Sequence, residues 1–347
     1  MHPNTMHPDT MPRLRSRRRF LQWSAASLAA ALPMTCATRQ AFGAEDEPAK
    51  ARVAITLDLE MSAQYPRREV TEWNYEKGNL DQATKDYAVE AARLVKERGG
   101  RIHFFCVGRV LEQADVQWLQ EIAKQGHPIG NHTYDHVNVL ATRPEETQFR
   151  FQRAPWLVQG ETSEQIIRRN VRLTSLAMKQ RLGIEPNGFR TPGGFATGLH
   201  GRPDVQQLLR EEGFRWISSK YPAHDSGPPE TVPGEKVFAS VVAAQAEAQP
   251  FTYPDGLVDL PMNPISDVHA FRANRWPLAS FLQAIEHALA WVIEGRQVYD
   301  FLAHPSCLVV EDPKMESLRK ICDLVEQSDG AAEIVTLDQI AAPLLPS

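Results

Sequence analysis

Two histidines spaced four residues apart, His132 and His136, follow a Gly-Asn pair. We expect this run to be helical, because residues i and i+4 share one face of a helix and both imidazoles could then reach one metal ion. Upstream, the apolar run 53–60 predicts a buried strand, and its carboxylates Asp58 and Glu60 point to the same side by the two-residue period of a strand. Two histidines and a carboxylate are a common ligand set of catalytic zinc.

Each of these features alone has a simpler explanation. A histidine pair at this spacing also arises by chance, and an aspartate at a strand end more often caps a turn or a helix. Arg190 and His304 lie at the ends of predicted strands far along the chain, where an arginine could form an ordinary ion pair and a histidine could bond to backbone. The metal-site hypothesis therefore depends on the combination of residues.

Helical and strand periodicities alternate along the chain. The expected helices cover residues 82–98, 113–125, 163–182, 204–212, 278–294 and 314–328. The expected strands cover residues 53–60, 101–108, 188–190, 214–218, 257–261, 299–305 and 333–337. Residues 221–256 are expected to form a long loop with a short strand at 237–242. This alternation predicts an α/β barrel of parallel strands joined by crossover helices, with its site at the carboxyl ends of the strands.

The first 44 residues differ in character from the rest. Arg17 and Arg18 precede an Arg-Phe-Leu triplet, and a short apolar, alanine-rich stretch follows over residues 23–32. This layout predicts a twin-arginine signal peptide and short linker, residues 1–44, that exports a single catalytic domain, residues 45–347, to the periplasm or the cell exterior. So short an apolar stretch cannot span a bilayer, so we expect no integral membrane segment in the mature chain. A disordered basic tail is the alternative.

The composition argues against one class of partner. Residues 1–44 contain six Arg and one Asp, so residues 45–347 hold 32 basic and 42 acidic residues, a formal net charge of −10. Nucleic-acid binding needs a basic surface, and we therefore expect no nucleic-acid partner. The mature part keeps Cys106, Cys307 and Cys322, which allow at most one disulfide and lack the spacing of a metal or redox site.

Taken together, five motifs resemble those of the polysaccharide deacetylase family, the chitooligosaccharide-deacetylase-like carbohydrate esterases. In chain order they are residues 56–60, 103–108, 126–136, 190–194 and 302–305. The long histidine motif is specific to the family. The arginine and terminal histidine motifs are weak evidence alone but strong evidence when they occur in this order. The resemblance covers roughly residues 51–340. It implies a distorted (β/α)7 barrel that removes an acyl group, usually acetyl, from an amino sugar.

The order of the family's motifs also implies a role for each residue. A divalent ion, expected to be zinc, would be held by three ligands: Glu60, His132 and His136. Asp58 would act as the general base that takes a proton from water, and Arg190 would hold this base through a charge-assisted contact. His304 would act as the general acid that protonates the departing amine.

The chain departs from the family pattern at two places. The usual first motif has adjacent aspartates, whereas here Leu59 separates Asp58 from Glu60. The usual fourth motif carries an Asp followed by Asp-Trp, and residues 216–220 offer neither. The second departure removes the expected partner that orients the arginine or tunes the last histidine.

The sequence thus predicts an exported, metal-dependent hydrolase that removes N-acetyl groups from an amino-sugar glycan, such as peptidoglycan, a chitin-like oligomer or an exopolysaccharide. One alternative is a metal-free or non-sugar amidohydrolase of the same fold. Another is a catalytically inactive carbohydrate-binding barrel. Substrate choice would reside in the loops 61–80, 141–162 and 220–256, and no individual substrate-binding residue is predicted.

Overall fold

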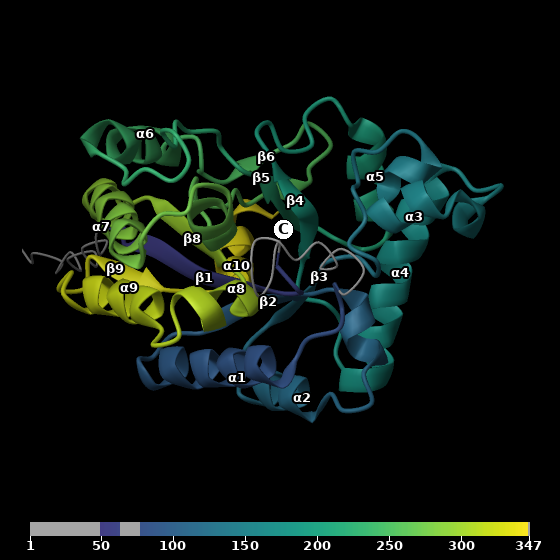
Figure 1. Cartoon of the computed structure of the whole chain (residues 1–347), viewed down its shortest axis with the longest axis horizontal. Coiled ribbons are helices and arrows are strands. Elements are labelled where there is room, and N and C mark those ends of the chain that lie inside the picture. The colour runs from purple at the N-terminus through teal and green to yellow at the C-terminus, as the bar shows by residue number, and fades with distance from the viewer. Residues whose placement is uncertain (1–48, 63–76, 346–347) are drawn as a thin grey trace, which may run out of the picture. The chain divides into compact units, whose positions relative to one another are not determined.

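The computed structural model of the chain describes residues 49–62 and 77–345. The described residues form one compact unit around a nine-stranded sheet (Figure 1). The predicted signal peptide and most of the loop 61–80 lie outside the described residues. The domain boundary at residue 45 therefore stays a prediction.

Seven strands run parallel in the order β7-β5-β4-β3-β2-β1-β8. Two short strands join them, β6 antiparallel to β7 and β9 parallel to β1. All but one residue of β1 are buried, as expected for a parallel strand that is covered on both faces. The fold is the distorted (β/α)7 barrel that the sequence predicted. The strands are β1 (Ala51–Leu59), β2 (Ile102–Cys106), β3 (Ile129–Asn131), β4 (Phe189–Phe195), β5 (Trp216–Lys220), β6 (Phe251–Thr252), β7 (Val258–Asp259), β8 (Val298–Ala303) and β9 (Ala332–Ile334).

β7 and β8 stand at the two ends of the parallel series, and no ladder joins them in the described part of the chain. Asn263 bridges this gap. Its backbone N–H donates to the carbonyl oxygen of Asp300 at 2.9 Å, and its side-chain oxygen accepts the N–H of Leu302 at 3.1 Å. A side-chain amide thus replaces strand pairing and fixes β8 beside the chain that follows β7.

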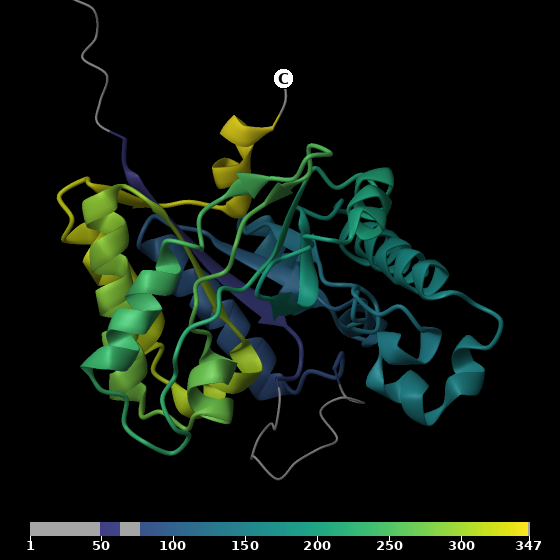
Figure 2. The same cartoon turned by 90° about the horizontal axis from the view of Figure 1, so that it is seen from above.

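Helices surround the strands (Figure 1 and Figure 2). Local capping explains where some of them begin and end: Asp81 accepts the N–H of Thr84 at 2.8 Å before α1, and Gly183, with φ 71°, ends α4. Six helices match predicted ones: α1 (Gln82–Glu97), α2 (Gln117–Lys124), α4 (Ser163–Leu182), α5 (Pro203–Glu211), α7 (Leu278–Gly295) and α9 (Glu316–Glu326). The remaining helices and helical turns are η2 (Gly108–Glu112), η3 (Pro144–Thr147), α3 (Phe149–Arg153), η4 (Pro155–Val158), α6 (Glu235–Gln245), the π-helix η5 (Val268–Ala273), α8 (Pro305–Glu311), α10 (Leu337–Ala341) and η6 (Ala342–Leu344).

The short strand predicted at 237–242 is wrong, because these residues belong to α6, which packs against α7. Val237, Val241 and Ala244 are buried and recur at helical spacing. The β-branched valines favour a strand locally. Burial of one helical face against α7 overrides that propensity.

The largest buried cluster lies between β1 and its covering helices and includes Ile55, Leu57, Leu94 and Leu289. Three cysteines, Cys106, Cys307 and Cys322, are buried and free. Among the described helices, none combines the length and the apolar character needed to cross a membrane. The core is therefore held together by apolar packing, without a disulfide among these three cysteines.

Candidate metal and catalytic site

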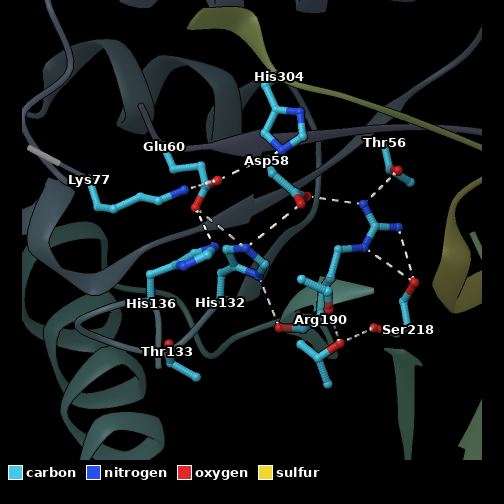
Figure 3. Close-up of polar contacts among 12 residues, drawn as sticks. Thr56, Asp58, Glu60, Lys77, His132, Thr133, His136, Arg190, Ser218 and His304 are labelled. Carbon is cyan, nitrogen blue, oxygen red and sulfur yellow. Dashed lines mark hydrogen bonds and ion pairs between the residues drawn. The ribbon is translucent and has the colours of Figure 1, made fainter. Parts of the chain in front are cut away.

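A pocket of about 380 Å³ lies at the carboxyl ends of the parallel strands. The predicted site residues converge on it from distant parts of the chain, and their side chains point toward one another in Figure 3. Asp58 lies in β1 and Glu60 directly after it; His132 follows β3, Arg190 lies in β4 and His304 follows β8. The pocket is lined by Asp58, Glu60, Lys77, His132, His136, Thr191, Gly193, Gly194, Tyr221, Met262, Ser266, Val268, His269, Ala273, Leu302 and His304.

The two histidines reach the pocket from a turn, so the predicted helical run is wrong. β3 ends at Asn131, whose side-chain oxygen accepts the N–H of Thr133 at 2.8 Å. Thr133 and His136 have positive φ values of 58° and 57°. A short polar side chain that bonds to nearby backbone competes with helix formation, which explains the error. The turn nevertheless brings the rings of His132 and His136 to 5.1 Å between centroids.

Three donor groups form a set that could hold a metal ion. One ligand atom from each of Glu60, His132 and His136 lies within 4.8 Å of the others. Oε2 of Glu60 lies 2.8 Å from Nε2 of His136 and 3.7 Å from Nε2 of His132. This buried oxygen has no hydrogen-bond partner among the described residues. A buried carboxylate oxygen that faces two imidazole nitrogens without a hydrogen bond fits a divalent cation between them.

The protonation of the histidines also suits metal binding. Nδ1 of His132 lies 3.0 Å from the carbonyl oxygen of Arg190, so this nitrogen donates and the lone pair remains on Nε2, toward the pocket. Burial lowers the pKa of His132, and it lowers the pKa of His136 to about 4. Burial opposes ionisation of Glu60, but the nearby His136 and Lys77 lower its pKa well below the usual value. At neutral pH the set is two neutral imidazoles and one carboxylate.

Lys77 is a site residue that the sequence reasoning missed. Its Nζ lies 2.5 Å from Oε1 of Glu60, and both side chains are only 4% exposed. The lysine approaches from the end of a loop whose earlier part is not described, and Figure 3 shows its side chain reaching Glu60. Its residue type and loop position gave no signal of this contact.

Arg190 holds the predicted base. Its Nη1 donates to Oδ1 of Asp58 at 3.0 Å and to the hydroxyl of Thr56 at 2.7 Å. The guanidinium is fully buried and lies over the ring of Phe105, 4.3 Å from its centroid. The other oxygen of Asp58, Oδ2, faces Nε2 of His132 at 3.7 Å. One oxygen of Asp58 is therefore fixed by the arginine while the other points toward the predicted metal ligands.

Asp300 supplies the partner of Arg190 that the missing fourth motif left open. Its Oδ2 accepts a hydrogen bond from Nη2 of Arg190 at 2.6 Å. Ser218, in β5, accepts from the same guanidinium at 3.1 Å. Burial raises the pKa of Asp300 to about 6, against the opposing effect of Arg190. An aspartate inside the apolar run of β8 was the signal in the sequence, because a buried carboxylate needs a partner.

Asp267 plays the corresponding part for His304. Oδ1 of Asp267 lies 2.8 Å from Nδ1 of His304, and Oδ2 accepts the backbone N–H of the same residue at 2.7 Å. Burial alone would lower the pKa of His304, but the charge and hydrogen bond of Asp267, with Asp58 and Glu60, raise it to about 9. Nε2 of this protonated imidazole lies 3.7 Å from Oε1 of Glu60. The arrangement can deliver a proton into the pocket.

Comparison with known proteins relates part of the chain to one sequence family. Residues 74–215 match the sequence family described as polysaccharide deacetylase. Over this part of the chain, the match confirms the resemblance to that family that the motifs predicted. No curated protein sequence matches the chain.

Several solved structures share the fold. A polysaccharide deacetylase structure from Mycobacterium smegmatis is 17% identical with a TM-score of 0.55, covering 87% of this chain and 92% of that one. One from Pseudomonas aeruginosa PAO1 is 14% identical with a TM-score of 0.55, covering 88% and 96%. Puue allantoinase is 13% identical with a TM-score of 0.53, covering 86% and 93%. At such identities the likeness establishes the fold alone.

Proposed function

We propose that this protein is an exported, zinc-dependent deacetylase that removes N-acetyl groups from an amino-sugar glycan. One observation carries the proposal. A Glu-His-His group able to hold a metal lines the same pocket as a buried aspartate fixed by an arginine and a histidine fixed by an aspartate. The match of residues 74–215 to the polysaccharide deacetylase family supports the choice of reaction.

Amide hydrolysis needs an activated water, a stabilised oxyanion and a proton for the leaving amine. Asp58 would accept the proton of the attacking water. This role is supported by Arg190, which binds Oδ1 at 3.0 Å and leaves Oδ2 toward the predicted metal ligands. As water oxygen bonds to the acetyl carbon, the carbon–nitrogen bond breaks. His304, with its pKa raised to about 9 by Asp267, gives its proton to the departing nitrogen. The products are acetate and a free amine.

Zinc is the ion that the donor set fits best, since two neutral imidazoles and one carboxylate leave a coordination position open. The residues that would hold it are Glu60, His132 and His136. Such an ion would lower the pKa of a bound water and polarise the acetyl carbonyl. Without such an ion, Oε2 of Glu60 would stay buried with no hydrogen-bond partner among the described residues.

Acetate release from a panel of substrates tests the proposal. The zinc-loaded protein is incubated with acetylated chitin oligomers, peptidoglycan and acetylated exopolysaccharide, with Asp58→Asn as the matched inactive protein. We expect acetate from at least one glycan and none above background from the variant. Glycan binding without acetate release would instead support an inactive carbohydrate-binding barrel.

A non-sugar amidohydrolase is the second candidate, and the similarity in fold to Puue allantoinase favours it over an inactive carbohydrate-binding barrel. The glutamate in place of the second aspartate and the absent fourth motif also fit a different substrate. Adding allantoin and simple acetamides to the panel separates the two enzyme candidates. Hydrolysis confined to these small amides, with no glycan product, would make the second candidate correct.

Export through a twin-arginine route is a separate part of the proposal. It is supported by Arg17 and Arg18 ahead of a short apolar stretch, in a segment outside the described residues. Lysine at both positions should leave precursor in the cytoplasm, as measured by cell fractionation. Normal export of the double variant would refute this route while leaving the chemistry untouched.

A further inference from the structure

The carboxylate of Glu60 uses its two oxygens for different purposes. Oε2 faces the imidazoles of His132 and His136, whereas Oε1 lies 2.5 Å from Nζ of Lys77. Both partners of this ion pair are nearly fully buried. A cation therefore already occupies one side of the predicted metal ligand.

Contacts with neighbouring segments hold the backbone of Lys77 and Gly78. Its carbonyl oxygen accepts the N–H of Met61 at 3.0 Å, just after β1. At the next residue, Gly78, a Cβ atom would lie 2.2 Å from Cβ of Arg109, so only glycine allows this close approach. Gln113 adds a hydrogen bond to the carbonyl oxygen of Gly78 at 3.2 Å. These contacts fix the position from which the ammonium reaches Glu60.

We propose that Lys77 sets the metal affinity of the site, keeping Glu60 a one-oxygen ligand and making the centre bind its divalent ion more weakly than the three ligands alone would. The inference rests on the metal-dependent part of the proposed function. It concerns a residue outside the ligand set and outside the predicted acid and base. Lys77 is thus a positioning residue that acts through Glu60.

Three physical effects work in the same direction. The ammonium holds Oε1, so a bidentate contact of Glu60 with an ion would require breaking a buried ion pair. Its positive charge also repels a divalent cation bound at the neighbouring oxygen, and this repulsion is strong where water is excluded. In the metal-free protein the same charge stabilises a carboxylate that would otherwise be buried without a counter-ion. Each effect favours the metal-free state relative to the metal-bound state.

Zinc affinity in variants of Lys77 tests this proposal. Lys77→Gln keeps a hydrogen-bond donor and removes the charge; Lys77→Arg keeps the charge. The matched control is Lys179→Gln, which breaks an exposed pair with Glu185 of 2.7 Å far from the pocket. Competition with a chelator gives the dissociation constant for zinc, and the absorption of bound Co²⁺ reports the ligand environment without any activity measurement.

We expect Lys77→Gln to bind zinc roughly ten- to a hundredfold more tightly, the scale at which partners of metal ligands act. Lys77→Arg and Lys179→Gln should stay close to the original protein. Lys77→Met is the second neutral variant, used if Lys77→Gln does not fold, and should also bind more tightly. Equal or weaker binding in the neutral variants would overturn the proposal.

The outcomes also separate this inference from the proposed function. If the original protein binds zinc and the neutral variants bind no more tightly, the role of Lys77 fails and zinc dependence stands. If only the neutral variants bind zinc, Lys77 is confirmed as the group that opposes the ion. If none of the proteins binds zinc, both the inference and the metal-dependent reaction fail.

Discussion

The two sides of the pocket satisfy their buried polar groups differently. The metal side comprises Glu60, His132 and His136, whose donor atoms face one another; Oε2 of Glu60 accepts no hydrogen bond within the described chain. On the arginine side, Arg190 donates to four side chains: Thr56, Asp58, Ser218 and Asp300. One buried oxygen on the metal side lacks a hydrogen-bond partner among the described residues, whereas the guanidinium of Arg190 is fully paired.

This difference separates binding from positioning. Buried polar groups are normally paired, and an unpaired group is costly unless a ligand satisfies it. Where the protein's own residues satisfy all hydrogen-bonding groups, catalytic side chains are held in fixed positions. Where a hydrogen-bonding group has no partner, the site is suited to bind an ion. His304 belongs with the completed groups, because Asp267 bonds to both its ring and its backbone.

His304→Ala should produce the largest effect. Loss of a general acid lowers turnover by roughly a hundred- to ten-thousand-fold, while the zinc content stays at the level of the original protein. Metal analysis and acetate-release rates on the same preparation measure both quantities. Loss of zinc in this variant would place His304 among the metal ligands and contradict the division between the metal side and the other groups.

Arg190→Met should lower the free energy of unfolding of the metal-free protein by about 3–5 kcal/mol, because two buried carboxylates lose their shared cation. His136→Gln, on the incomplete side, should change it by less than about 1 kcal/mol. Urea unfolding in the presence of a chelator measures both. Similar losses in the two variants would contradict the contrast between the sides.

Asp267→Asn should change the pH dependence more than the maximal rate. Asp267 raises the pKa of His304, so the acid form persists in the original protein until pH rises through about 9. With a neutral partner the alkaline limb of kcat/KM should move roughly one to three pH units lower. An unchanged limb would mean that this pair does not control the proton donor.

His127 provides the smallest predicted effect, away from both sides. It is buried, its Nδ1 accepts the N–H of Ile102 at 3.0 Å, and burial lowers its pKa from 6.5 to about 4. A lowered pKa gives stability that is present above pH 6.5 and lost as pH falls toward 4. In His127→Gln, the fall in the free energy of unfolding on acidification should be smaller than in the original protein by about 1–3 kcal/mol. Unfolding curves of both proteins, recorded near neutral pH and near the lowered pKa, measure this. If the fall in the free energy of unfolding between the two pH values is the same in the variant and the original protein, the role of His127 is refuted.

The parallel α/β barrel could be predicted because most of its strands are buried apolar runs, as in β1. The convergence of Asp58, Glu60 and the two histidines was expected from the barrel, whose site lies at the carboxyl ends of its strands, and from the order of the family's motifs. The turn at Asn131 could not be predicted, because a local side-chain hydrogen bond overrides the helical spacing of the histidines. Likewise α6 depends on packing against α7.

The positioning partners were not predicted for a different reason. Asp300 meets Arg190, 110 positions earlier, and Lys77 meets Glu60 across a loop. Such contacts depend on tertiary arrangement, and the local sequence carries only a weak mark of them. A charged residue within an apolar strand, such as Asp300, is one sequence signal of such a contact.

Paired variants of the two neighbouring carboxylates test the division between binding and positioning most directly. Asp58→Asn should retain stoichiometric zinc while turnover falls by roughly a hundred- to ten-thousand-fold. Glu60→Gln should weaken zinc binding itself. Metal analysis together with acetate-release rates on both proteins measures this. A protein that never holds zinc, with Asp58→Asn still inactive, would contradict the metal-dependent reaction and support a metal-free amidohydrolase.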